Sequence, residues 1–343
     1  MSSGLRRVAK RVNRALGRQA PPSAPWVVAE AQPAVPEPLE TFKLFAIVCA
    51  WMESDVIAAT VANALAQGCD AVYLVDNDSP DDTVAQAVGA GAILAERFST
   101  ERFEEQLRFD IMNRVVADVS ASDGSDHIWW LWIDADEFPH GPRGLTVREY
   151  LASLDRRYRI VGSRFINHFP DSEPAYLSGF HPLEFQPLCE EHLVRVCKLQ
   201  HRKHSLQRFD RLGNPIECGL GIHGATSADR PLVEPTEAVY LHHFPYRAPD
   251  FTRHRLATLC GTDEHGRTRV HDGDTAVDGM VPRFETLEAV YAGEWSRVRN
   301  YRFEDDHSVA NPKPWSDIAP PEDRVFKRWY SAEALETARN PAS

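Results

Sequence analysis

The feature that most constrains this chain is a continuous apolar run that ends abruptly in acidic residues. Residues 127–133 read HIWWLWI, and Asp134, Ala135, Asp136 and Glu137 follow directly. The run is short for a helix and rich in β-forming residues, which predicts a strand buried on both faces of a parallel sheet. Ligands of open α/β sheets bind beyond the carboxyl ends of the strands. The sequence therefore predicts a ligand site where this strand ends.

The aspartates at this strand end, Asp134 and Asp136, indicate a divalent cation. In an extended chain, residues two apart point the same way, so the two carboxylates would repel each other unless a cation lay between them. Hard oxygen ligands suit Mg2+ or Mn2+, and such ions usually also bind phosphates. A solvated acidic turn is the alternative, and the apolar run in front of the pair argues against it.

Strands and helices alternate before this run. A strand at 43–50 leads into a helix through Val61 and Leu65, which Ser54 or Asp55 caps and Gly68 ends. Further strands are expected at 71–75 and 92–94, and further helices through Val84 and Val88 and over 101–119. This alternation predicts a mostly parallel sheet with helices on both faces and right-handed crossovers.

After the acidic residues the pattern becomes irregular. A helix is expected at 146–154, strands at 158–167 and 238–241, and helices near 250–260 and 283–298. Short strands and loops rich in histidine and proline lie between them. We expect an irregular α+β half that completes the first half, within one domain that spans residues 42–310. Residues 311–343 are expected to form a proline-rich tail.

Charge and composition limit the partners. The 343 residues carry a formal net charge of −12, which argues against nucleic acid. Residues 1–41 are expected to form a separate segment, in which a short basic amphipathic helix over 5–18 is suited to an anionic membrane surface and 19–41 form an extended linker. A disordered tail, or a helix docked on the acidic body, is the alternative.

The same features predict where the protein lies in the cell. The apolar runs are too short to span a membrane, and no signal-peptide pattern occurs. The six cysteines show no CxxC spacing, which predicts a reducing compartment. We expect a cytoplasmic protein, with peripheral binding to the inner membrane face.

Polar residues at other positions extend the predicted site. Asp76 ends the 71–75 strand, where its carboxylate is placed to accept a hydrogen bond from a uracil ring N–H or a ribose hydroxyl; an ordinary turn residue is the alternative. Together with a metal-bound diphosphate this predicts one nucleotide-diphosphate site. His243 is a candidate additional Mn2+ ligand. Candidate cations for a leaving diphosphate are Lys198, Arg202, Lys203, Arg247, Arg253 and Arg255.

Taken together, these motifs resemble the GT-A glycosyltransferases, and within them the family 2-like group, over roughly residues 43–255. The resemblance implies that Asp76 contacts the nucleotide base and that Asp134 and Asp136 bind the divalent metal and the donor diphosphate. The other matching positions, which the resemblance places at or near the nucleotide and metal site, are Glu53, Asn77, Lys198, His223, His243 and Arg247.

The chain also departs from the family pattern. Met52 precedes Glu53 where the family commonly has Asn-Glu, and the carboxylate pair that many members use for the acceptor is not evident. His223, Glu217 and Asp171 therefore stay open as alternatives for the catalytic base.

The expected activity is metal-dependent transfer of a sugar from a UDP- or GDP-sugar to a hydroxyl of a glycan or lipid-linked acceptor, as in polysaccharide biosynthesis. A metal-dependent nucleotidyl or phosphoryl transferase and a non-catalytic carbohydrate-binding peripheral membrane protein stay open as alternatives.

Overall fold

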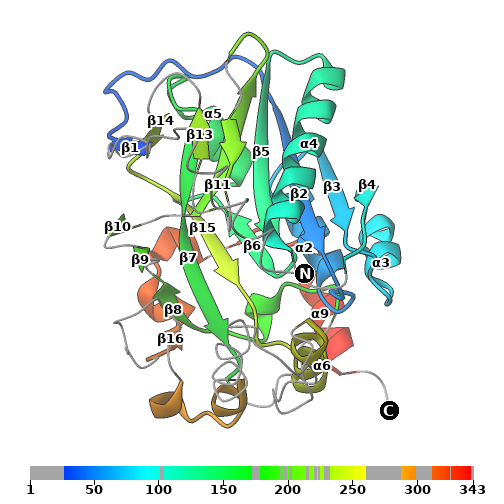
Figure 1. Cartoon of the computed structure of the whole chain (residues 1–343). Coiled ribbons are helices and arrows are strands. Elements are labelled where there is room, and N and C mark those ends of the chain that lie inside the picture. Colours follow the sequence, from blue (N-terminus) through cyan, green and yellow to red (C-terminus); the bar gives the residue numbers. More distant parts are fainter. Residues whose placement is uncertain are drawn as a thin grey trace, which may run out of the picture.

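The computed structural model shows one large sheet with helices packed against it (Figure 1). It describes residues 27–100, 104–171, 178–192, 195–196, 199–200, 203–213, 216–219, 222, 225–227, 232–259, 287–298, 311–324 and 326–340. The expected amphipathic helix at 5–18, and the candidate residues Lys198, Arg202 and His223, lie outside the described residues.

The first half of the sheet is parallel, as the sequence predicts. Its strands lie in the order β4-β3-β2-β5, and each neighbouring pair is parallel. The bounds are β2 (Lys43–Ala50), β3 (Ala71–Asp76), β4 (Ile93–Arg97) and β5 (His127–Asp134). The apolar run is therefore the strand expected, and Asp134 is its last residue.

The second half of the sheet corrects the expectation of a mostly parallel sheet. β11 (Lys203–Asp210) lies antiparallel between β5 and β7 (Ile160–Phe169), and β8 (Leu188–His192) and β16 (Lys313–Pro314) continue in antiparallel pairing. β15 (Val239–His243) pairs parallel with β7 and antiparallel with β6 (Glu137–His140). The sheet is therefore mixed, with parallel pairing from β4 to β5 and mostly antiparallel pairing beyond β5.

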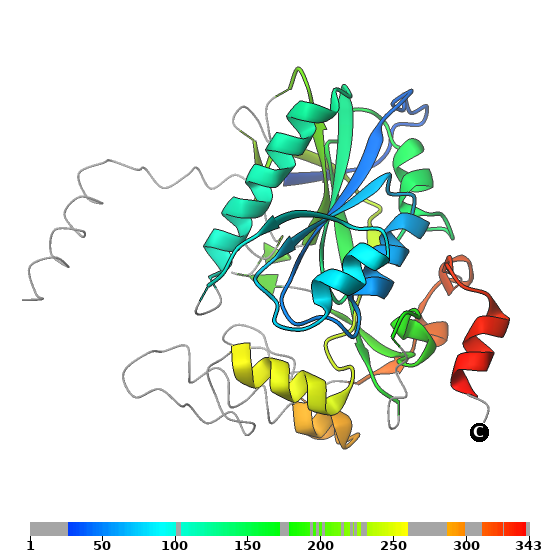
Figure 2. The ribbon, with the colours of Figure 1, turned by 90° about the vertical axis from the view of Figure 1, so that its right-hand side faces the viewer.

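Helices cover both faces of the parallel half, which explains why β5 shows no alternation of apolar and polar residues. On one face, Trp129 and Leu131 pack in the core that contains α2 (Ile57–Ala66), α3 (Thr83–Gly89) and α5 (Val147–Ala152). On the other face, Trp130 and Trp132 pack in the core that contains α4 (Glu105–Asp123) (Figure 2). Both sets of side chains are buried, and the α/β class expected from the sequence is confirmed.

One helix start differs from the expected one. Val56 occupies the N-cap of α2, and no side chain caps it. Asp55 is engaged elsewhere, because its carboxylate accepts a hydrogen bond from Arg247 Nε at 2.7 Å. Gly68 follows the helix with φ +96°, a conformation that glycine adopts at little cost, so the expected end is confirmed.

The described parts of the expected linker and tail pack on the domain. β1 (Val27–Glu30) pairs with β14 (Leu232–Pro235), and the Arg156 N–H donates to the Glu37 carbonyl at 2.8 Å. In the tail, the Asp323 carboxylate accepts a hydrogen bond from the Tyr240 hydroxyl at 2.8 Å. Proline-rich composition predicts an extended chain, but both segments find backbone or side-chain partners on the domain. The domain boundaries stay a prediction.

Short elements complete the described fold. The remaining strands are β9 (Arg195–Val196), β10 (Leu199–Gln200), β12 (Ile216–Cys218) and β13 (Ala225–Ser227). The remaining helical elements are η1 (Pro182–Glu184), α6 (Pro249–Leu259), η3 (Trp295–Arg297), α8 (Trp315–Ile318), η4 (Pro321–Arg324) and α9 (Ala332–Arg339). Within the described residues, no helix combines the length and the apolar character needed to cross a membrane.

Candidate functional site

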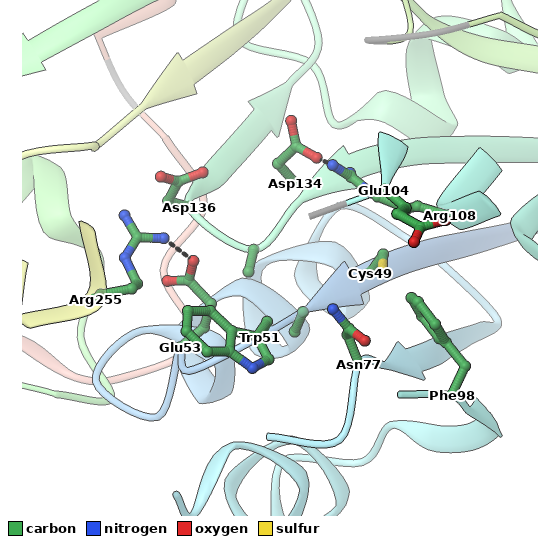
Figure 3. Close-up of a pocket in the computed structure, with 12 residues that line it drawn as sticks. Cys49, Trp51, Glu53, Asn77, Phe98, Glu104, Arg108, Asp134, Asp136 and Arg255 are labelled. Atoms are coloured by element: carbon green, nitrogen blue, oxygen red, sulfur yellow. Dashed lines mark hydrogen bonds and ion pairs between the residues drawn. The ribbon is translucent and has the colours of Figure 1, made fainter. Parts of the chain in front are cut away.

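A cavity of about 180 Å³ opens at the carboxyl ends of β2, β3 and β5 (Figure 3). These three strands are parallel, so their ends meet at one edge of the sheet, which is where the sequence places the site. The lining residues are Cys49, Ala50, Trp51, Glu53, Asn77, Phe98, Glu104, Arg108, Asp134, Ala135, Asp136 and Arg255.

Both oxygens of Asp134 are held by cations. Arg108 Nη2 pairs with Oδ1, and Lys203 Nζ lies 2.9 Å from Oδ2. Burial raises the pKa of Asp134, but Arg108 and Lys203 outweigh burial and hold that pKa well below its usual range. Lys203 also pairs with Glu137, which accepts a hydrogen bond from the Asp134 N–H at 2.9 Å. Asp134 is therefore an ionised carboxylate in a tightly defined position.

Asp136 has different partners. Its Oδ2 lies 3.5 Å from His243 Nε2 and 3.5 Å from Arg247 Nη1. Burial raises the pKa of Asp136, but His243, Arg247 and Arg255 outweigh it, so the pKa is held well below its usual range. The Asp136 carbonyl accepts a hydrogen bond from the Phe244 N–H at 3.0 Å, which ties the acidic turn to the end of β15.

The orientation of His243 suits a metal ligand. Its Nδ1 lies 2.7 Å from Asn167 Oδ1, and an amide oxygen only accepts hydrogen bonds. Nδ1 therefore carries a proton, and Nε2, the atom that faces Asp136, is the ring nitrogen that a metal could bind in place of a proton. Among the described residues, however, no three His, Cys, Asp or Glu side chains form a ready-made metal cage.

Arg247, expected at the nucleotide, lies behind the cavity rather than in its lining. Its side chain is fully buried, and it donates to Glu53 Oε2 at 2.5 Å and to Asp55 Oδ2 at 2.7 Å. Burial raises the pKa of Glu53 to about 7, against the opposing effects of Arg255 and Arg247. In this structure Arg247 organises the carboxylates that face the cavity.

Asp76 and Asn77 occupy different environments at the end of β3. Asp76 is fully buried, and its carboxylate accepts hydrogen bonds from the Ser79 N–H at 3.2 Å and from Arg97 Nε at 3.0 Å. Asn77 lines the cavity, and its amide is paired with Thr100. The Ser79 bond at Asp76 is that of a turn residue, the Arg97 pair joins the ends of β3 and β4, and Asn77 is the member of the pair that lines the cavity. The nucleotide contact of Asp76 stays a prediction.

Two of the three candidates for the catalytic base do not line the cavity. Asp171 is exposed just after β7, and Glu217 is exposed on β12. Neither is among the lining residues. His223 lies outside the described residues, so the assignment of the base stays a prediction.

Several residues that line the cavity were not predicted from the sequence, although the sequence indicates the position of two of them. Glu104 and Arg108 lie at the start of α4, the helix that leads into β5. A crossover helix in a parallel sheet begins at the carboxyl edge, so polar residues in its first turn are placed at the site. Trp51 and Phe98 follow β2 and β4, and nothing in their local pattern separates them from ordinary loop aromatics.

Comparisons by sequence find no match: no family model and no curated protein matches the chain. Comparisons by structure find similar solved proteins. Glucosyl-3-phosphoglycerate synthase from Mycobacterium tuberculosis, with Mn2+, UDP and glucosyl-3-phosphoglycerate, matches 36% of this chain and 44% of its own length, at 18% identity and a TM-score of 0.26. Mannosyl-3-phosphoglycerate synthase from Rubrobacter xylanophilus matches 36% of this chain and 40% of its own length, at 20% identity and a TM-score of 0.26.

A longer alignment exists with the mycobacterial synthase bound to Mn2+, UDP-glucose and phosphoglyceric acid. It covers 65% of this chain and 82% of that one, at 16% identity and a TM-score of 0.32. In the first two comparisons, the chain spans less than half of the length of the synthases. These proteins are of the kind that the sequence resemblance predicts. With TM-scores below 0.5, the likeness carries no argument about the activity of this chain.

Proposed function

We propose that this chain is a metal-dependent glycosyltransferase, which moves a sugar from a nucleotide-diphosphate sugar to a hydroxyl of a glycan or lipid-linked acceptor. The observation that carries the proposal is the cavity at the carboxyl ends of β2, β3 and β5, which combines Asp134 and Asp136 with Arg108 and Arg255. Acidic groups beside arginines at a sheet edge suit a metal ion together with a phosphate-bearing ligand.

The residues present fit Mn2+ or Mg2+. Asp136 and Nε2 of His243 face each other, and Asn167 accepts from Nδ1, which leaves Nε2 as the ring nitrogen available to a metal. Two protein ligands are sufficient when phosphate oxygens and water complete the coordination, which is common for Mg2+. When bound, the ion would supply charge stabilisation to the departing diphosphate.

The other residues of the cavity account for binding and orientation. Asn77 presents an amide, and Phe98 an aromatic ring, at the part of the cavity that the ends of β3 and β4 form. We assign the nucleoside to this part. Arg108 and Arg255 supply positive charge for the phosphates. A hydroxyl of the acceptor attacks the anomeric carbon, and the base that takes its proton stays open among His223, Glu217 and Asp171.

Donor turnover in the absence of acceptor tests the proposal. Purified protein is incubated with a panel of UDP- and GDP-sugars, with and without Mn2+, and the released products are quantified. We expect slow, Mn2+-dependent release of UDP or GDP. Release of pyrophosphate would instead indicate a nucleotidyltransferase, and binding of sugars without any release would indicate a non-catalytic carbohydrate-binding protein.

Two aspartate variants sharpen this test. Asp136→Asn should abolish Mn2+-dependent release and should leave the circular dichroism spectrum unchanged, because β5 is held by its apolar core. Asp250→Asn is the matched control, since the Asp250 side chain is exposed on α6 and pairs with Arg253. Near wild-type turnover by Asp136→Asn would refute the metal assignment.

A further inference from the structure

Two carboxylates that line the cavity are each held by two cations, one behind and one in front. Behind Asp134 lies Lys203, whose side chain is only 4% exposed; in front lies Arg108, which is 15% exposed and lines the cavity. Behind Glu53 lies Arg247, which is 0% exposed; in front lies Arg255, which is 21% exposed and lines the cavity. The same arrangement therefore occurs on two separate strand ends.

The rear cations are committed to the protein. Lys203 bridges Asp134 and Glu137, and Arg247 bridges Glu53, Asp55 and the Phe244 carbonyl. Removing either one would leave buried carboxylates without a counter-charge, which is strongly unfavourable. These two side chains have no freedom to serve a ligand.

The front arginines are different. If Arg108 leaves Asp134, the carboxylate keeps Lys203, and if Arg255 leaves Glu53, that carboxylate keeps Arg247. Both guanidinium groups reach the cavity, and guanidinium binds phosphate oxygens in the same two-pronged way that it binds carboxylates. Their ion pairs are thus the ones that an anionic ligand can exchange for its own oxygens.

We propose that Arg108 and Arg255 are exchangeable cations, which pair with Asp134 and Glu53 in the free protein and turn to the diphosphate when the donor binds. The proposal rests on the proposed function for the identity of the ligand. It adds the residues that recognise the phosphates and the partners that they leave.

The arrangement also couples the metal to the diphosphate. Asp136 and Asp134 act on each other electrostatically, so a divalent cation held by Asp136 would repel the guanidinium of Arg108 and would compete with it for the Asp134 oxygens. Metal binding therefore favours release of Arg108 towards the phosphates, and the coupling is reciprocal by thermodynamic necessity. Without a diphosphate, Arg108 competes with the metal for the Asp134 oxygens. With a diphosphate bound, Arg108 and the metal both bind its phosphate oxygens.

Substitution of Arg108 tests this double role through two binding measurements. Affinity for Mn2+ alone is measured by calorimetry, and affinity for UDP and GDP is measured at saturating Mn2+. In Arg108→Gln, we expect Mn2+ to bind several-fold more tightly, because a competing positive charge is gone. We expect the nucleoside diphosphate to bind about 10- to 100-fold more weakly, the usual loss for hydrogen bonds to charged groups.

Three further variants separate this role from a merely structural one. Arg108→Lys keeps the positive charge, so Mn2+ affinity should stay near wild type while diphosphate affinity is intermediate. Arg255→Gln should weaken diphosphate binding, and it should raise the affinity for Mn2+ alone only through the loss of its charge near Asp136, since Glu53 is not a proposed metal ligand. Arg114→Gln is the matched control: Arg114 lies on the same helix and pairs with Glu96 outside the cavity lining, so neither affinity should change.

The outcomes distinguish this inference from the proposed function. If wild-type protein binds neither UDP nor GDP with Mn2+, the proposed function fails and the inference fails with it. If wild-type protein binds a nucleoside diphosphate but Arg108→Gln binds it equally well, or if Arg108→Gln does not bind Mn2+ more tightly, the inference alone is overturned. A fall of both affinities in Arg108→Gln would indicate a structural role and would also overturn it.

Discussion

Lys203 provides a direct test of how the acidic end of β5 is held. Its ammonium group lies 2.9 Å from Asp134 Oδ2 and also pairs with Glu137, and the Lys203 and Glu137 side chains are 4% and 1% exposed. Burial lowers the pKa of Lys203, but the two carboxylates outweigh burial and raise that pKa above its ordinary value. Lys203→Met keeps most of the side-chain volume and removes only the charge.

The cost of Lys203→Met follows from the groups left behind. Asp134 retains Arg108, whereas Glu137 loses its cation inside the protein. Removing one partner of a buried ion pair costs about 3–5 kcal/mol of unfolding free energy. We expect a loss of this size at pH 8, measured by urea unfolding with tryptophan fluorescence.

The loss should shrink at lower pH. Burial already raises the pKa of Glu137, and loss of Lys203 raises it further. When the pKa of a carboxyl group is higher in the folded than in the unfolded state, its protonated form stabilises the fold. This contribution to the unfolding free energy is complete below the unfolded-state pKa and is lost as pH rises through the folded-state pKa. The destabilisation by Lys203→Met should therefore be smaller at pH 5.5 than at pH 8, by up to about 1.4 kcal/mol per pH unit.

A double-mutant cycle supplies the control. Glu137→Gln keeps an oxygen that can accept the Asp134 N–H, so the pair Lys203→Met and Glu137→Gln should recover most of the stability lost at pH 8. A loss below about 1 kcal/mol at pH 8, or no recovery in the double variant, would refute this account of the buried pair.

Three further predictions use other parts of the chain. Gly141→Ala should lower the unfolding free energy by about 1–3 kcal/mol, because the new Cβ would lie 2.6 Å from a backbone oxygen, whereas Gly89→Ala, with nothing within 4 Å, should not be destabilising; equal effects would contradict this. Burial lowers the pKa of His140 to about 4 and of His168 to about 3, so the unfolded state takes up more protons below about pH 6.5, and urea midpoints should fall between pH 6.5 and 4.5; a flat profile would contradict it. Full-length protein should sediment with anionic vesicles at low salt and lose this binding at high salt, while protein lacking residues 1–26, which retains β1, should not sediment; equal behaviour of both would leave the tail without a membrane role.

The local sequence determined the parallel half of the sheet. An apolar run without alternation specified that β5 is buried on both faces, and repeats at three and four residues specified the helices that cover it. The position of Asp134 at the end of that strand then places it at the ligand edge. These features are predictable because hydrophobic periodicity and turn residues act over a few neighbouring positions.

Sequence reasoning was less successful after the acidic turn. It predicted a mostly parallel sheet, and the structure has β11 antiparallel to both β5 and β7. Strand direction depends on how a long connection returns to the sheet, and an apolar strand looks the same in either direction. This return matters for the site, because β11 carries Lys203 to Asp134.

Local sequence is enough to show which carboxylates end which strands, and hence the edge of the sheet where they gather. The cation that each carboxylate meets depends instead on how the chain packs: Arg108 from α4 and Lys203 from β11 meet Asp134, and His243 from β15 meets Asp136. Charged residues are common along the chain, and their local pattern does not specify a partner. Ion pairing is set by distance and burial, which arise only when segments remote in sequence pack against one another.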